Sequence, residues 1–274
     1  MDRVTLKSCN NSNCITALQV TDMHLFGHEN DCLLGIDTAY SFQAVIDAVR
    51  QQNIAFDIIL ATGDLSQDYS YDSYKRFAEM VKQLEKPVFW LPGNHDDGPL
   101  MRRIMPEFGV SIASNIIIGE WQFIMLNTQV YSVPHGWILP DQLEYAHKCI
   151  NDNPHLKTVI CLHHNTFPVN SAWLDQHELK NKNELLDLVY KHPQVKLVLC
   201  GHVHQETDFV SNNVRFISSP STSIQFEPLS FNFGLDAQGP GWRYLNFYSN
   251  GNIDSTVYRL NFDDFKPDFA ICGY

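Results

Sequence analysis

Five apolar segments of this chain end in side chains that can bind a metal ion, and this repeated layout constrains the fold more than any other feature. The segments are 15–20, 57–62, 88–91, 158–162 and 195–200; the groups that follow them are Asp22 with His24, Asp64, Asn94 with His95, His163 with His164, and His202 with His204. Short runs of β-forming residues predict buried strands. Because ligands of layered α/β proteins bind at the carboxyl ends of strands, we expect these groups to converge.

The segments between these strands predict helices. Apolar residues recur at helical spacing over 38–52 and 70–84, and shorter helices are predicted over 141–150 and 183–190. The order strand, helix, strand, helix, strand is typical of a layered α/β fold. Segments 116–118 and 121–127 predict a hairpin that turns at Gly119 and Glu120.

The last third of the chain changes character, because its apolar segments have the pattern of strands alone. Strands are expected over 214–218, 243–248 and 253–260. We therefore expect a second, largely antiparallel sheet that packs on the first. No linker, repeat or low-complexity segment interrupts the sequence, so we expect one domain over residues 1–274.

The composition argues against several classes of partner. Acidic residues number 31 against 19 basic residues, a formal net charge of −12, whereas a nucleic-acid groove needs a basic surface. No segment is long and apolar enough to span a membrane, and residues 1–12 lack the apolar stretch of a signal peptide. We expect a cytoplasmic protein that binds neither nucleic acid nor membrane. Cys161 and Cys200 lie in apolar runs and are expected to be buried.

The ligand chemistry favours two metal ions. Carboxylates, imidazoles and one amide oxygen suit manganese, iron or zinc, and the ligands are too many for a single ion. Asp64 stands alone at the end of its strand, so we expect its carboxylate to bridge the ions. In Asp22-x-His24, as in the later His-x-His motif, we expect both side chains to lie on one side of an extended segment.

The segment after the third strand adds a proton donor to this set. Asn94 offers a neutral oxygen ligand, His95 can donate a proton near neutral pH, and Asp96 could orient the imidazole of His95. The alternative is a plain turn, since Gly, Asn and Asp are turn residues. Four further motifs with the same layout make the turn the weaker interpretation.

Together these motifs resemble the calcineurin-like metallophosphoesterases. The family pattern D-x-H, G-D, G-N-H-[DE], H and G-H-x-H appears here as Asp22-Met23-His24, Gly63-Asp64, Gly93-Asn94-His95-Asp96, His163 and Gly201-His202-Val203-His204. Within the family, His163-His164 and segments 219–226 and 239–244 are similar to the bacterial class III 3′,5′-cyclic AMP phosphodiesterases. Those proteins often have prolines after the double histidine, whereas Asn165-Thr166-Phe167-Pro168 follows here.

The resemblance implies a mixed α/β (α+β) fold, a four-layer α/β/β/α sandwich of the metallo-dependent phosphatase type. It also implies that Asp22, His24 and His204 bind the first metal ion, that Asn94, His163 and His202 bind the second, and that Asp64 bridges the two ions. His95 would be the general acid, with Asp96 as its partner, and His164 would lie behind the metal ligands. The residues implied to contact the substrate are Asn94, His95 and His204. Whether His163 or His164 is the direct ligand stays open at this point.

The implied activity is hydrolysis of cyclic AMP to 5′-AMP by a hydroxide that bridges two ions, iron or manganese, with zinc as the alternative. Another small phosphate ester, such as a glycerophosphodiester, is the competing substrate. A non-catalytic scaffold would lack ligands, and none is missing. Phe226, Trp242 and Tyr244 could stack on a base, although core packing is the favoured role. The remaining histidines are expected to be surface or packing residues: His28, His135, His147, His155, His177 and His192.

Overall fold

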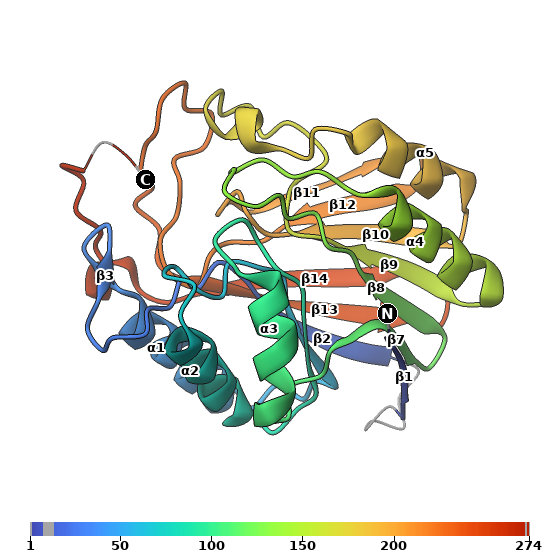
Figure 1. Cartoon of the computed structure of the whole chain (residues 1–274), viewed down its shortest axis with the longest axis horizontal. Coiled ribbons are helices and arrows are strands. Elements are labelled where there is room, and N and C mark those ends of the chain that lie inside the picture. The colour runs from blue at the N-terminus through green and yellow to red at the C-terminus, as the bar shows by residue number, and fades with distance from the viewer. Residues whose placement is uncertain (1, 8–13, 272, 274) are drawn as a thin grey trace.

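Two mixed β-sheets lie face to face at the centre of the molecule (Figure 1). The computed structural model describes residues 2–7, 14–271 and 273. The seven-stranded sheet has the order β1 (Asp2–Leu6), β7 (Ala113–Ile118), β8 (Trp121–Met125), β9 (Lys157–Cys161), β10 (Val195–Cys200), β12 (Val214–Ser218) and β11 (Thr207–Ser211). The five-stranded sheet has the order β14 (Ile253–Arg259), β13 (Gly241–Tyr248), β2 (Cys14–Val20), β5 (Ile58–Ala61) and β6 (Val88–Trp90). A short hairpin pairs β3 (Cys32–Leu33) with β4 (Ile36–Asp37).

Helices cover the outer face of each sheet, which confirms the predicted four-layer α/β/β/α sandwich (Figure 1). Three helices pack on the five-stranded sheet: α1 (Thr38–Gln52), α2 (Tyr71–Lys82) and α3 (Gly98–Ile104). Two pack on the seven-stranded sheet: α4 (Pro140–Asp152) and α5 (Lys182–Lys191). None of the helices in the described residues is long and apolar enough to cross a membrane.

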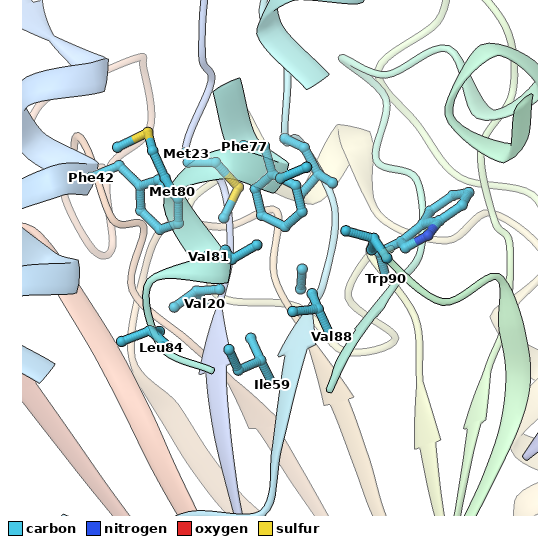
Figure 2. Packing of buried hydrophobic residues seen from close by; sticks show 14 of the residues in the cluster. Val20, Met23, Phe42, Ile59, Phe77, Met80, Val81, Leu84, Val88 and Trp90 are labelled. Carbon is cyan, nitrogen blue, oxygen red and sulfur yellow. The ribbon is translucent and has the colours of Figure 1, made fainter. Parts of the chain in front are cut away.

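Strand β2 shows how the sequence specifies these layers. Its side chains alternate, so that Leu18 and Val20 face α1 and α2 whereas Ile15 and Ala17 face the other sheet. Figure 2 shows the helix-facing layer, in which Phe42 of α1 stacks on Phe77 of α2 with ring centroids 6.2 Å apart. Each sheet is therefore buried on both faces, which is why its central strands are continuous apolar runs.

The predicted separate sheet in the last third of the chain is wrong. β12 lies parallel to β10 in the seven-stranded sheet, whereas β13 lies antiparallel to β2 in the five-stranded sheet. The late strands therefore complete both sheets and do not build one of their own. The elements that were not predicted include the largely exposed edge strands β1 and β11, the short strands β3 and β4, and the short helix α3.

The strands that carry the metal-binding motifs are divided between the two sheets. β2, β5 and β6 are parallel neighbours in the five-stranded sheet, and β9 and β10 are parallel neighbours in the other. The hairpin of β7 and β8 joins β9 at its edge, as predicted for a hairpin in this part of the chain. The motif residues consequently meet where the two sheets face each other.

Candidate dimetal active site

The predicted ligands form one buried cluster between the two sheets. His163 Nε2 lies 3.2 Å from Asp64 Oδ2, and His204 Nε2 lies 3.4 Å from Asp22 Oδ1. His24 Nε2 lies 3.2 Å from His204 Nε2. The cluster includes every predicted metal ligand, and all are buried except the half-buried Asn94: Asp22, His24, Asp64, Asn94, His163, His202 and His204.

The backbone at these ligands differs from the expected extended segment. Asp22, His24 and Asp64 have φ values of 55°, 50° and 52°, and the two ligands of the His-x-His motif also lie in this left-handed region. Non-glycine residues adopt this conformation at a cost and mostly at functional sites. The amide of Asp22 donates to Gly63 O and that of His24 to Asp64 O, both at 3.0 Å. Two loops that are hydrogen-bonded to each other, and not alternation along a strand, therefore bring these side chains together.

Hydrogen bonds to the second ring nitrogen orient three of the imidazoles. His163 Nδ1 lies 2.8 Å from Thr62 O, and His204 Nδ1 lies 2.9 Å from Ile224 O. His24 Nδ1 lies 2.8 Å from Gln67 Oε1. When Nδ1 is fixed in this way, Nε2 keeps a lone pair that points at the cluster, as is usual for histidines that bind metals.

The donor set fits metal cations. The carboxylates of Asp22 and Asp64 are buried close together, an arrangement that cations would stabilise. His202 Nε2 is buried and has no hydrogen-bond partner in the described part of the chain. Burial lowers the pKa of His24 to about 3 and that of His202 well below its usual value, so both rings are neutral and can coordinate.

Of the two adjacent histidines, His163 is the one held against the carboxylates. Its Nε2 also lies 3.1 Å from Asn94 Oδ1, whereas His164 Nδ1 lies 2.8 Å from Thr128 Oγ1. The ring of His164 lies behind, with its centroid 4.7 Å from that of His202. The geometry favours His163 as the direct ligand.

His95 and Asp96 differ in their surroundings. The half-buried imidazole of His95 lies 5.1 Å from the ring of His24, and its backbone amide donates to Asp64 Oδ1 at 2.8 Å. The buried carboxylate of Asp96 accepts hydrogen bonds from three backbone amides, those of Leu65, Ser66 and Gly93. It therefore ties the loop after β6 to the loop after β5, and its predicted role as the partner of His95 stays a prediction. Burial and the nearby carboxylate of Asp64 raise the pKa of Asp96 to about 7, although these amides oppose the shift.

A cavity of about 700 Å³ opens beside the cluster. Its lining includes Asp64, Asn94, His95, His202 and His204 of the cluster, and an aromatic wall that includes Trp173, His177, Phe226 and Phe233. His177 is partly buried and packs against Trp173, as expected of a packing residue, and it also lines the cavity. Trp242 and Tyr244 lie in the core beneath α1 and α2, as the favoured packing role requires, whereas Phe226 reaches the cavity.

Comparison with known proteins identifies the family. The model of the calcineurin-like phosphoesterases matches residues 15–206, the segment that carries all five motifs. The chain belongs to the calcineurin-like phosphoesterase family. A curated member, the 3′,5′-cyclic adenosine monophosphate phosphodiesterase CpdA of Escherichia coli K12, is 44% identical over 261 residues, which cover 95% of each chain. A 3′,5′-cyclic-nucleotide phosphodiesterase of Nostoc is 37% identical over 90% of this phosphoesterase and 92% of the relative.

Solved structures show the same fold at low sequence identity. A dimetal phosphatase from Danio rerio has a TM-score of 0.57 at 13% identity and matches 89% of this phosphoesterase and 98% of its own chain. A purple acid phosphatase from yellow lupin has a TM-score of 0.58 at 14% identity, with 94% and 55% of the two chains matched. The described histidine and aspartate groups of the present chain could bind metal ions.

Proposed function

We propose that the protein hydrolyses 3′,5′-cyclic AMP to 5′-AMP with the help of two metal ions. The observation that carries the proposal is the convergence of all the predicted ligands in a cluster beside the cavity described above. The near full-length similarity to a relative named as a cyclic AMP phosphodiesterase supports the choice of substrate.

We assign the metal ligands as the resemblance implied. Asp22, His24 and His204 would hold one ion, Asn94, His163 and His202 the other, and Asp64 both; the three-residue groups within the cluster are consistent with this division. The mixed oxygen and nitrogen ligands favour iron or manganese, with zinc as the alternative. When bound, such ions supply a water that is deprotonated near neutral pH and positive charge that stabilises the phosphoryl oxygens.

The residues of the chain itself would position the substrate and supply a proton. Asn94, His95 and His204 line the cavity at the cluster and would contact the phosphoryl oxygens. A water oxygen that attacks phosphorus opposite O3′ would form the new P–O bond as the P–O3′ bond breaks, and the protonated ring of His95 would donate its proton to the departing O3′. Burial lowers the pKa of His95, so the negative charge of the bound phosphate would have to favour the protonated ring. The hydrogen bonds that three backbone amides donate to Asp96 would hold the loop that carries His95 in place beside the cluster.

The test is turnover of a substrate panel by purified protein with defined metal content. We expect cyclic AMP to give 5′-AMP and not 3′-AMP, as separated by chromatography, and we expect a chelator to stop the reaction. Rapid hydrolysis of glycerophosphodiesters without turnover of any cyclic nucleotide would refute the proposal in favour of the competing substrate class.

A further inference from the structure

The aromatic wall of the cavity has a specific internal geometry. Trp173 contacts three rings nearly edge to face: Phe226 at 4.9 Å and 82°, Phe233 at 5.2 Å and 65°, and His177 at 6.2 Å and 84° between centroids and planes. These contacts fix the indole in place. Among the described residues, no ring lies parallel to Trp173 in a stacked arrangement, so a stacking contact with a ligand is still available.

Phe226 connects this wall to the metal-binding cluster. Its ring stacks on the imidazole of His204, with centroids 4.2 Å apart and planes inclined by 17°. The side chain is only 1% exposed, so it forms the floor between the two regions. A substrate whose phosphoryl group lies at the cluster would therefore extend its remaining part over Phe226 toward Trp173.

The charge of the wall indicates the chemical nature of the part of the substrate that lies beyond the phosphoryl group. The described residues that line the cavity include no lysine or arginine, so the wall offers no cationic partner for a second phosphate or a carboxylate. Rings of Trp and Phe favour a flat, uncharged group with a π-face. A nucleobase has these properties, whereas the glycerol moiety of a glycerophosphodiester does not.

His177 adds a polar group to this otherwise apolar wall. It is the last residue of the 3₁₀ turn Leu174–His177 and lines the same cavity. It is not one of the proposed metal ligands. Burial, followed by the charges of Lys180 and His135, lowers its pKa, so the ring is neutral at pH 7. A neutral imidazole has one N–H donor and one lone pair, and either of them can form a hydrogen bond with one polar group on the edge of adenine.

We propose that Trp173, with Phe226 and Phe233, forms the subsite that binds the nucleobase of the substrate, and that His177 contacts the polar edge of that base. This subsite rests on the proposed cyclic nucleotide activity and extends it to the residues that select the substrate. It predicts that the wall contributes to binding only when the ligand carries a base.

The first test compares 5′-AMP with ribose 5-phosphate, which has the same phosphate ester and no base. Calorimetric titration of the metal-loaded enzyme should show tighter binding of 5′-AMP. In Trp173→Ala this preference should fall by about 10-fold, the order of one base–aromatic contact, while the affinity for ribose 5-phosphate stays the same. Trp137→Ala is the matched control, because Trp137 is a partly exposed tryptophan outside the cavity lining, and it should keep the preference.

The outcomes separate the subsite from the proposed function. If the wild type binds both ligands equally and does not hydrolyse cyclic AMP, the proposed function fails and the subsite fails with it. If the wild type hydrolyses cyclic AMP but Trp173→Ala keeps the preference for 5′-AMP, the subsite alone is refuted. Equal losses for both ligands also refute it, because they indicate damage to the metal cluster. Trp173→Leu, which keeps much of the apolar volume, provides the same comparison if the alanine variant does not fold.

The second test addresses His177 through steady-state kinetics. His177→Ala should raise KM for cyclic AMP several-fold with little change in kcat, since the residue is proposed to touch the base and not the phosphorus. On methyl p-nitrophenyl phosphate, which has no base, kcat/KM should be unchanged. A fall in kcat on both substrates would refute the assignment of His177 to the base.

Discussion

Replacing Asp96 should destabilise the metal-free protein far more than replacing its neighbour Asp97. In Asp96→Ala the amides of Leu65, Ser66 and Gly93 lose their common acceptor. A buried donor left without a partner costs about 1–3 kcal/mol. The ionised carboxylate is buried and lies near that of Asp64, and removing this unfavourable charge offsets part of the cost, so we expect a net loss of about 3 kcal/mol in the free energy of unfolding.

Thermal unfolding in the presence of a chelator, at pH 8, measures this loss with Asp96 ionised and without a contribution from bound metal. A loss of about 3 kcal/mol corresponds to a fall in Tm of about 6 °C or more in a domain of this size. Asp97 caps α3 through one hydrogen bond to the amide of Leu100, so Asp97→Ala should cost only about 1 kcal/mol. Equal Tm values for wild type and Asp96→Ala, with a loss of activity confined to substrates with poor leaving groups, would refute this reasoning. That result would support the predicted role of Asp96 as the partner of the His95 imidazole.

Three further predictions concern the proposed reaction and the metal cluster. His95→Ala should keep its metals and lose about 10²–10⁴-fold in kcat on cyclic AMP. The loss should be much smaller on bis(p-nitrophenyl) phosphate, because its leaving group needs little protonation. Equal losses of kcat on both substrates would exclude His95 as a general acid. Asp64→Ala should lose activity and at least one metal ion per chain by elemental analysis, and full occupancy would contradict the bridging role. A Cβ at Gly93 would collide with the carboxylate and amide of Asp64, so Gly93→Ala should lower both Tm and metal content, costing about 1–3 kcal/mol; an unchanged protein would show that the loop can move away.

The sequence predicted the elements whose signals are local. The helix over 38–52 was predicted with the bounds that α1 has, because the spacing of its apolar residues is a local signal. The strands before the ligands were found for the same reason. Strand β1 was missed, since Asp2–Leu6 is half-exposed at a sheet edge and lacks a buried apolar pattern. Strand partners depend on distant residues, and this is why β12 and β13 were placed in the wrong sheet.

The same distinction applies to the site. Residue types and spacing predicted which side chains gather at the cluster, because metal-binding chemistry restricts them strongly. The partners of Asp96 are backbone amides, two of them from another loop, and backbone groups carry no sequence signal. Trp173 and His177 lie far along the chain from the ligands and have no periodic pattern, so only the three-dimensional arrangement shows that they share the cavity.

The division of the ligands between the two sheets has a consequence for the order of assembly. Under the proposed assignment, the five-stranded sheet alone carries Asp22, His24 and Asp64, three of the four ligands of the first ion, but only Asp64 and Asn94 for the second. A folding chain in which only this sheet had formed could retain the first ion weakly, whereas capture of the second must await the docking of the seven-stranded sheet. Each ion then cross-links the two sheets, so the free energy of metal binding also resists their separation.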